Sequence, residues 1–453
     1  MIFDHHASLR KEKISPKVLD PDTKYIGLEH IGEGTLSLNG FGYASDVNSS
    51  KAVFEKGHIL FGKLRPYFRK VIIAPFDGIC STDIWVVKPK NGIDRNFLFY
   101  WMASQDFVDD VTRSSEGTRM PRAKWKVASN IEIPDVDTEK QKEIGQILYT
   151  LDQKIHLNQQ TNETLEAIAQ AIFKSWFVDF DPVRAKIEAR STGRDPNRAA
   201  MAAIAGLQVP LYGKKSHSAE ASWDRLDQMS DCERTQLHQT AELFPDELVE
   251  SEIGEMPKGW EIDSVFNQAE YINGAPFRGK DFSKSKAGLP VIKIAELKSG
   301  LTDQTKFTEK DVKDKYHMDS GDILFSWSGN PDTSIDIFIW EGGPGLLNQH
   351  IFKIESESKS RKVFNYYFLK SMLPFFKRTA ANKQTTGLGH LTQRDLKRKQ
   401  IHVPSKELIT GFSEIAEPIF DKVFSNLVKV QTLSKLRDTL LPKLISGEMM
   451  MNN

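Results

Sequence analysis

The chain has little cysteine and no long apolar run, and each shortage excludes a class of protein. Its 453 residues include two cysteines, Cys80 and Cys232, too few for a disulfide framework or a cysteine-rich zinc site. We therefore expect a reducing, cytoplasmic environment. The longest nearly apolar stretch, residues 199–209, is shorter than the roughly 18 residues that a membrane span requires. The N-terminus lacks a basic segment followed by an apolar one, so no secretory signal is expected.

The motifs of common enzyme classes are missing as well. The sequence holds no phosphate-binding GxxxxGK(S/T) loop, no GxSxG nucleophile turn and no HExxH metal motif. Residues 330–333 (NPDT) lack the second proline and the aromatic residue of a base-methyltransferase motif, and they are typical of a turn. A metal-dependent nuclease could use Asp332, Glu357 and Lys359, but residues 355–360 form a serine-rich polar loop. The sequence therefore indicates a chain that binds rather than one that catalyses.

Net charge is also absent, because 61 Lys and Arg residues balance 61 Asp and Glu residues. The two signs are nevertheless separated along the chain. Residues 377–399 hold seven basic residues and one acid, residues 113–126 hold five and one, and residues 242–255 hold six acids and no base. Such a pattern suits a protein that presents basic surfaces to a polyanion and other surfaces to protein partners. The alternative is an ordinary solvated surface of mixed charge.

What the sequence does have is an internal repeat of long period. Four blocks match in the same order, at offsets between 264 and 270: residues 25–31 with 291–297, 57–61 with 321–325, 117–134 with 387–404, and 147–176 with 415–444. A single apolar match would be common by chance, but four in order are not. Small changes in the offset are what loop insertions would produce. The chain therefore contains two copies of one unit.

Each copy is predicted to combine a globular part with a long helix. The globular part spans about 140 residues of short Val-, Ile-, Phe- and Trp-rich runs broken by Gly and Pro, which predict strands. Helical stretches such as residues 96–107 and 363–376 lie between these runs. The fold class predicted for each globular part is α/β (mixed α+β).

The helices are predicted from a heptad pattern. A seam of positions steps by four and three from Ile144 to Trp176, and again from Phe412 to Leu444, and all but four of these positions are apolar. At 1.5 Å per residue, these helices would be roughly 40–50 Å long. Pro418 interrupts the second pattern and indicates that this helix starts or kinks there.

Two similar helices in one chain are expected to pair with each other. A chain that imitates a dimer should use two-fold geometry, which makes the helices antiparallel and places the globular parts at opposite ends of a rod. Alternatively, each helix folds back on its own globular part. Asn158 and Asn426 occupy the same repeat position, where a polar residue can fix the register of a coiled coil. They could equally be solvated asparagines beside the seam.

The division that follows has five parts. We predict a first globular domain at residues 1–140, a first long helix at 141–180, a connector at 181–254, a second globular domain at 255–405 and a second long helix at 406–448.

Both globular domains carry a polar, basic loop at the same repeat position, residues 113–122 and 383–394. Lys and Arg neutralise phosphates, while Arg suits guanine edges and Asn or Gln suits adenine edges. One scaffold with different side chains would read two different half-sites, and the rod would set the gap between them. The candidate DNA-binding residues come from these loops and two basic strips, although each is alternatively a solvated surface residue: Lys63, Arg65, Arg69, Arg113, Thr118, Arg119, Arg122, Lys124, Arg278, Lys280, Lys284, Lys383, Gln384, Thr385, His390, Gln393 and Arg394.

Several segments carry a resemblance to a known family. The chain resembles the specificity subunits of type I restriction-modification systems in residues 175–186 (SWFVDFDPVRAK), 243–246 (LFPD), 254–260 (GEMPKGW), 321–325 (GDILF) and 440–448 (LLPKLISGE). The resemblance extends from about residue 20 to residue 448. It departs from the family at the start of the first half, which has no PKGW opening, and residues 205–240 match nothing.

The resemblance implies a function for each part. Each globular domain would be a target recognition domain that reads one half of a bipartite site on double-stranded DNA. The helices would be the spacer and the docking surface for two methyltransferase (modification) subunits, and restriction (motor-nuclease) subunits would add cleavage. S-adenosylmethionine, ATP and Mg²⁺ would be bound by these partners and not by this chain. Trp176, Phe177 and Phe180 would be exposed at the partner interface or, alternatively, buried in the chain's own core.

Two other functions stay open on the sequence alone. The chain could be a self-contained nuclease or methyltransferase with a degenerate active site, which would act on DNA without partners. It could also be a scaffold protein, which would bind duplexes without sequence preference.

Overall fold

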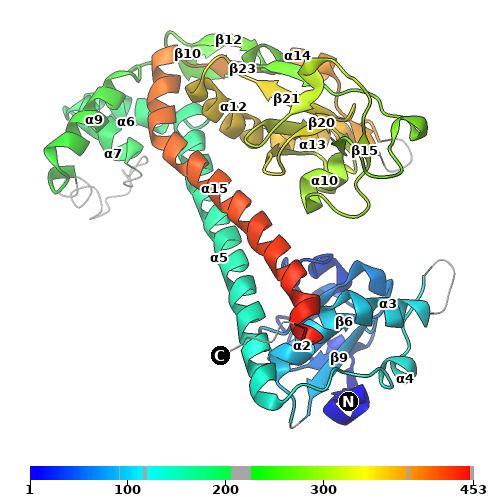
Figure 1. Ribbon diagram of the computed structural model, residues 1–453. Helices are drawn as coiled ribbons and strands as arrows, with labels where there is room; N and C mark the ends of the chain where they lie inside the picture. Colours follow the sequence, from blue (N-terminus) through cyan, green and yellow to red (C-terminus); the bar gives the residue numbers. More distant parts are fainter. Residues whose placement is uncertain (91, 116–119, 206–225, 385–387, 449–453) are drawn as a thin grey trace. The chain divides into compact units, whose positions relative to one another are not determined.

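The computed structural model describes residues 1–90, 92–115, 120–205, 226–384 and 388–448 (Figure 1). The chain forms two compact units, one made of Met1–Asn158 with Thr432–Asn453 and the other of Gln159–Gln431. The division passes through both long helices, so the five-part division drawn from the sequence stays a prediction. No helix among the described residues has the length and apolar character needed to cross a membrane.

The first unit has two sheets. An antiparallel sheet has the order β1 (Ala7–Leu9), β9 (Ile84–Pro89), β6 (Ile59–Gly62) and β7 (Val71–Ile73). A second sheet has the order β2 (Lys13–Ile14), β5 (Lys51–Phe54), β8 (Gly78–Cys80), β3 (Lys24–Ile26) and β4 (Gly42–Tyr43), with β3 and β8 parallel. The α-helices are α1 (Phe3–His6), α2 (Arg95–Ala103), α3 (Gln105–Arg113) and α4 (Trp125–Ala128).

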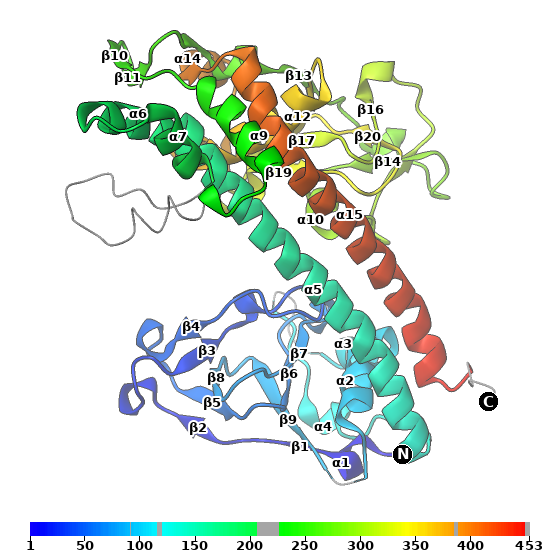
Figure 2. The ribbon, with the colours of Figure 1, turned by 90° about the vertical axis from the view of Figure 1, so that its left-hand side faces the viewer.

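The central strands of this unit are buried on both faces, which explains their continuous apolar runs. In β6, Ile59 and Phe61 belong to one core cluster with the α2 residues, whereas Leu60 belongs to another with Phe54 of the second sheet. Successive side chains of a strand point to opposite faces, so the four-stranded sheet lies between the helices and the second sheet. Figure 2 shows this order of layers.

The second unit repeats this topology. Its antiparallel sheet has the order β13 (Glu270–Asn273), β21 (Ile351–Glu355), β17 (Ile323–Ser326) and β19 (Asp336–Ile339). Its second sheet has the order β15 (Phe307–Thr308), β14 (Leu289–Ile292), β20 (Gly345–Leu347) and β16 (His317–Met318). The helices of this part are α10 (Ile294–Ser299), α11 (Pro331–Ser334), α12 (Lys359–Ser371), α13 (Leu373–Ala381) and α14 (Gln393–Arg398).

The strand registers confirm the repeat found in the sequence. Tyr25 pairs with Ile79 in a parallel ladder, and its repeat counterpart Val291 pairs in the same way with Leu346. Likewise β6 and β17 each occupy the third position of an antiparallel four-stranded sheet. The predicted fold class, two copies of a mixed α/β unit, is confirmed.

The connector is mainly helical. It holds α6 (Asp181–Ser191), α7 (Pro196–Ile204) and α9 (Asp231–Glu242), followed by a hairpin of β10 (Leu248–Ser251) and β11 (Gly254–Pro257). Strand β12 (Glu261–Ser264) pairs with β23 (Gln400–Val403), directly before the second long helix. The buried Lys186 ammonium of α6 donates to the Phe244 carbonyl at 2.6 Å, and burial lowers its pKa. This bond ties α6 to the segment that follows α9.

The two long helices are α5 (Thr138–Phe177) and α15 (Lys406–Ile445). Each has 40 residues and is therefore about 60 Å long, longer than the 40–50 Å expected. The expectation that α15 starts at Pro418 is wrong, because the helix begins twelve residues earlier and continues through this proline. Proline is tolerated there because tertiary packing outweighs local propensity: Phe412, Ala416, Phe420 and Val423 are all buried.

The helices pair in antiparallel fashion. In the second unit Asn162 of α5 contacts Asn426 of α15, and further along α5 the Trp176 ring packs against Phe412, earlier in α15. In the first unit Asp152 of α5 binds Arg437 of α15. The alternative in which each helix folds back on its own domain is wrong.

A buried asparagine pair marks the seam. The Asn426 amide donates to the Asn162 side-chain oxygen at 2.9 Å, and the Asn162 amide donates to the Val423 carbonyl at 3.1 Å. The sequence singled out Asn158 instead, but that residue is half-buried and donates to the Lys154 carbonyl of its own helix. The reason is geometric. Between two helices that run in opposite directions, residues at the same repeat position need not oppose each other, and the partner of Asn426 is the asparagine one turn beyond Asn158.

Replacement of this pair tests its role. We expect Asn162→Leu alone to lower the free energy of unfolding by about 1–2 kcal/mol, because it leaves the buried Asn426 amide without its acceptor. The double variant Asn162→Leu/Asn426→Leu removes both polar groups and should recover most of that loss. Urea unfolding of the full chain measures both effects. A double variant less stable than the single one would show that the pair stabilises by itself.

Candidate nucleic-acid interface

In the first unit, two loops that carry candidate residues are joined by backbone hydrogen bonds. Leu64 and Arg122 form an antiparallel bridge, the Arg65 N–H donates to the Pro121 carbonyl at 2.8 Å, and the Ala123 N–H donates to the Lys63 carbonyl at 2.9 Å. The segment after β6 and the segment before α4 therefore form a short two-stranded ladder of residues 63–65 and 121–123, which we call the ledge. It brings together Lys63, Arg65, Arg122 and Lys124, which the sequence placed in two separate groups.

The second unit joins its loops in the same way. Strand β18 (Ser328–Gly329) pairs with β22 (Gly389–His390), and the Leu391 N–H donates to the Trp327 carbonyl at 2.9 Å. This ladder is the repeat counterpart of the Leu64–Arg122 bridge. The strand register places Trp327 at the position of Lys63 and His390 at the position of Arg122, two residues before the position that the sequence match of 117–134 with 387–404 gives. The two units thus share a backbone frame and differ in the side chains that it carries.

Several candidate side chains of the first unit already have acidic partners. The Arg122 guanidinium makes two bonds to the Asp83 carboxylate, at 2.9 and 3.2 Å, and these bonds raise its pKa. Arg113 is exposed at the end of α3, with Asp110 at 3.5 Å. Arg65 and Lys124 are exposed, and Lys63 is half-buried. Thr118 and Arg119 lie outside the described residues.

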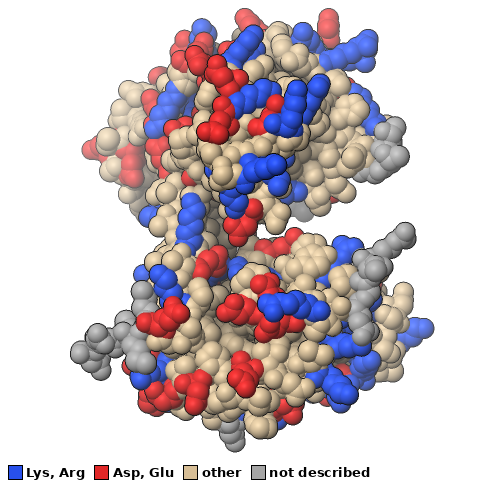
Figure 3. All heavy atoms as spheres, turned by 45° about the vertical axis from the view of Figure 1, so that its right-hand side comes forward, with Lys and Arg blue, Asp and Glu red and all other residues tan. Residues whose placement is uncertain are grey.

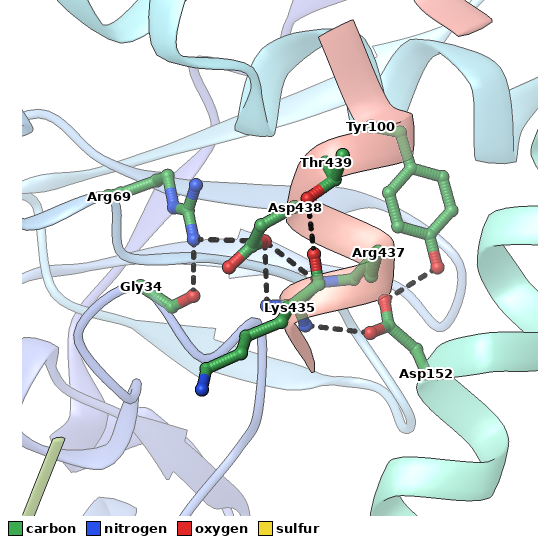
Figure 4. Close-up of polar contacts among 8 residues, drawn as sticks. All are labelled: Gly34, Arg69, Tyr100, Asp152, Lys435, Arg437, Asp438 and Thr439. Carbon is green, nitrogen blue, oxygen red and sulfur yellow. Dashed lines mark hydrogen bonds and ion pairs between the residues drawn. The ribbon is translucent and has the colours of Figure 1, made fainter. Parts of the chain in front are cut away.

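Arg69 does not fit the role that the sequence gave it. Its side chain is 18% exposed, its Nη2 donates to the Gly34 carbonyl at 2.7 Å, and it faces the Asp438 carboxylate at 3.6 Å (Figure 4). Burial lowers its pKa, partly offset by Asp438. Arg69 therefore ties its loop to α15 and to the Gly34 turn, and most of its side chain is buried.

Arg69 belongs to a larger polar network within the first unit. Arg437 of α15 is almost fully buried and donates to Asp152 of α5 at 2.8 Å. Asp152 also accepts a bond of 2.6 Å from the Tyr100 hydroxyl of α2, and burial strongly raises the pKa of that phenol. Figure 4 shows these side chains converging from three helices and the Arg69 loop. The end of α15 is therefore built into the first unit.

In the second unit the loop residues divide between bonded and exposed ones. Both oxygens of Asp395 accept bonds of 2.5 Å from the Lys383 ammonium. Burial alone would raise the pKa of Asp395, but the bonds from Lys383 and Thr392 lower it below its ordinary value. The exposed candidates of this loop are Gln384, His390, Gln393 and Arg394, while Thr385 lies outside the described residues.

The remaining basic strip is a separate feature. Arg278, Lys280 and Lys284 are exposed around η6 (Gly279–Asp281), in the segment between β13 and β14. Asp281 in this segment binds Lys310 at 3.3 Å and accepts from the Arg278 N–H, and the latter bond lowers its pKa. On the face drawn in Figure 3, basic and acidic side chains are interspersed rather than gathered into one basic patch.

The groups weighed for catalysis do not form a site. Lys359 is held by Glu417 at 2.5 Å and Asp421 at 2.8 Å on α15, and Asp332 lies on α11. Among the described residues, no group of three or more His, Cys, Asp or Glu side chains could hold a metal ion.

The three aromatic residues expected at a partner interface are buried in the second unit's own core. The Trp176 ring packs against Phe244 and Phe412, and Phe180 packs against Trp260. Phe177 is also buried, at 8% exposed. The expectation of exposure is corrected to the alternative that the sequence left open. The heptad pattern alone could not distinguish exposure from burial of these rings, because it does not show that Phe244 and Trp260 pack against the end of α5 and the residues that follow it.

Comparisons with known proteins agree with one another. The family model of the type I restriction modification DNA specificity domain matches residues 11–167 and 257–425, well over half of the chain. The chain is 31% identical over 454 residues to the type I restriction enzyme HindI specificity subunit of Haemophilus influenzae, covering 94% of this chain and 95% of that protein. It is 24% identical over 406 residues to the MjaIX specificity subunit of Methanocaldococcus jannaschii, covering 88% and 79%.

Solved structures of similar proteins also align with the chain. A crystal structure of the HsdS subunit from Thermoanaerobacter tengcongensis aligns with 15% identity and a TM-score of 0.34, covering 99% of this chain and 96% of that one. The S subunit of a type I system from M. genitalium aligns with 13% identity and a TM-score of 0.48, covering 98% and 95%.

Proposed function

The chain belongs to the family of type I restriction-modification DNA specificity subunits, and from this premise we propose how its two units share the work of recognition. It is the non-catalytic subunit that recognises the target site in a type I restriction-modification complex, where the cofactor-dependent chemistry takes place on partner subunits. Each of the two units reads one half of a bipartite site on double-stranded DNA.

One observation carries this proposal. The joined loops have the same backbone frame in both units, yet Arg122 and Lys63 of the first are replaced by His390 and Trp327 of the second. A shared frame with different side chains is what two readers of unlike sequences need, because base edges are distinguished by the donors and acceptors placed against them. The exposed basic residues add affinity that does not depend on sequence.

The partners follow from the same family. Two methyltransferase (modification) subunits bind S-adenosylmethionine and dock on this chain, and restriction (motor-nuclease) subunits bring ATP- and Mg²⁺-dependent cleavage. The complex acts in the cytoplasm. The long helices α5 and α15 are the docking surface, because Leu157, Ile168 and Leu436 remain exposed on them.

Mapping of methylated sites tests the proposal. We expect DNA modified by this chain together with its methyltransferase partner to carry one motif made of two specific halves and a non-specific gap of fixed length. The chain without its partner should methylate and cut nothing. A continuous motif with no gap, or methylation of unrelated sequences, would contradict the assignment of one half-site to each unit.

A further inference from the structure

A short proline turn follows β6 in the first unit and is held in an unusual backbone conformation. Arg65 and Arg69 both adopt left-handed φ angles, 51° and 48°, on either side of η4 (Pro66–Phe68). Such angles in residues other than glycine cost on the order of 1 kcal/mol each, and they persist only where the surroundings impose them. Strain of this kind concentrates at functional sites.

Hydrogen bonds from neighbouring segments hold this turn in its left-handed backbone conformation. The Arg65 N–H is bound by the Pro121 carbonyl, and the Gly34 N–H donates to the Phe68 carbonyl at 3.1 Å. The Arg69 guanidinium closes the turn on Gly34 and Asp438, as Figure 4 shows. Pro66 is buried beneath the turn. The tip is therefore fixed on each side, and it lies beside the ledge that carries Lys63 and Arg122.

What the rigid tip presents is an aromatic side chain. Tyr67 is 49% exposed, although large aromatic residues are usually buried, and its ring is braced edge-on by Phe68 at 4.8 Å between centroids. The basic residues were the only candidates that the sequence offered in this segment. A further signal is the Arg-Pro-Tyr string that begins three residues after a buried strand.

The second unit also has a buried proline after the corresponding strand, one residue further along than Pro66. Gly329, which follows β17 as Arg65 follows β6, also has a positive φ, of 117°. Pro331 is buried, and the next two residues, Asp332 and Thr333, are exposed. Asn330 fixes them, because its side chain accepts from their N–H groups at 3.0 and 3.2 Å. The residue at the same distance from the strand as Tyr67 is Pro331, and the exposed residues that follow it are an acid and a hydroxyl instead of a tyrosine.

We propose that these proline turns are a second reading element of each unit, with Tyr67 contacting base edges of the first half-site and Asp332 contacting those of the second. This inference rests on the proposed function. A tyrosine offers a hydroxyl to base donors and acceptors and a ring face to thymine methyl groups, and it loses little rotamer entropy because the tip is preorganised. An aspartate accepts from the amino group of cytosine. Asp332 therefore favours cytosine at one position of the second half-site.

Selection from a randomised duplex library tests the proposal, with the full chain in complex with its methyltransferase partner. We expect Tyr67→Ala to lower the preference at one or two positions of a single half-site about tenfold, within the range of a single base-pair contact. Asp332→Ala should do the same in the other half-site only. Tyr67→Phe separates the hydroxyl from the ring. Tyr43→Ala is the matched control, because Tyr43 is a comparably exposed tyrosine on β4 of the same unit, away from the long helices and the candidate loops.

The outcomes are distinguishable. An unchanged preference profile for Tyr67→Ala, with selection intact in the unaltered complex, overturns the inference and leaves the proposed function standing. The inference is likewise overturned if affinity falls uniformly for all sequences, since that pattern identifies a phosphate contact, or if both half-sites change. If the unaltered complex selects no sequence, the proposed function and the inference both fail. Equal thermal unfolding midpoints for Tyr67→Ala and Tyr43→Ala exclude misfolding as the cause.

Discussion

Exchange of residues 1–140 for the corresponding segment of a relative with another specificity changes one half of the recognised motif and leaves the other half intact. This is the largest effect that we expect, because half-site recognition is replaced rather than weakened. Specific binding exceeds non-specific binding by about 10³-fold or more, so the new half-site should replace the old one completely. Mapping the methylated motif of cells that carry the chimera and its methyltransferase partner gives the result directly.

The structure sharpens where the junction should lie. Residues 432–453 belong to the first unit, and Leu441, Leu444 and Ile445 of α15 are part of its core. A chimera joined at residue 140 keeps the native Asp152 and Asp438 but replaces their partners Tyr100 and Arg69. A donor segment that retains a tyrosine and an arginine at these two positions is the control for a defect in folding. A change in both halves of the motif would disprove the assignment of one reader to each unit.

The fold was predictable from the sequence wherever a pattern repeated. The matched strands, the strand-rich globular parts and the pairing of the two heptad-patterned helices all appear among the described residues, because periodic burial leaves periodic apolar residues. What depends on distant neighbours was not predictable. Pro418 lies within a continuous helix because buried residues on both sides of it pack against the core. Trp176 is buried because Phe244, 68 residues later, returns to cover it.

The candidate interface was likewise predictable only in part. The sequence located the loops and their basic residues, but it could not show which of those residues are paired with acidic side chains. Arg122 is bound by Asp83, 39 residues earlier, and Arg69 by Asp438 at the other end of the chain. Tyr67 was missed because exposure of an aromatic residue leaves no mark in a composition or a charge run. The Arg-Pro-Tyr string marks a turn, but it does not show that the backbone on both sides of Tyr67 is left-handed or that its ring is exposed.

Removal of the buried Arg437 guanidinium should lower the stability of the first unit by about 3 kcal/mol, the second large effect that we expect. Its side chain is 3% exposed, and Arg437→Met would leave the Asp152 carboxylate, itself 18% exposed, with the Tyr100 hydroxyl alone. Burial by itself lowers the pKa of Arg437, but Asp152 and Asp438 raise it above its ordinary value, so the guanidinium remains charged throughout the stable pH range. Urea unfolding of the full chain measures the loss, and hydrogen exchange in α2 and the start of α5 assigns it to this unit.

Two matched variants decide what the loss means. Arg190→Met removes an arginine from the exposed ion pair with Asp246 and should cost less than about 1 kcal/mol. Asp152→Asn/Arg437→Met removes both buried charges and should be more stable than Arg437→Met alone, because most of the cost comes from a charge left without its partner. If the double variant is as unstable as the single one, the guanidinium acts through its packing between α2, α5 and α15. In that case the Arg437 side chain stabilises the packing of the last turns of α15 within the first unit. Both variants should then also lose the contact between Arg69 and Asp438.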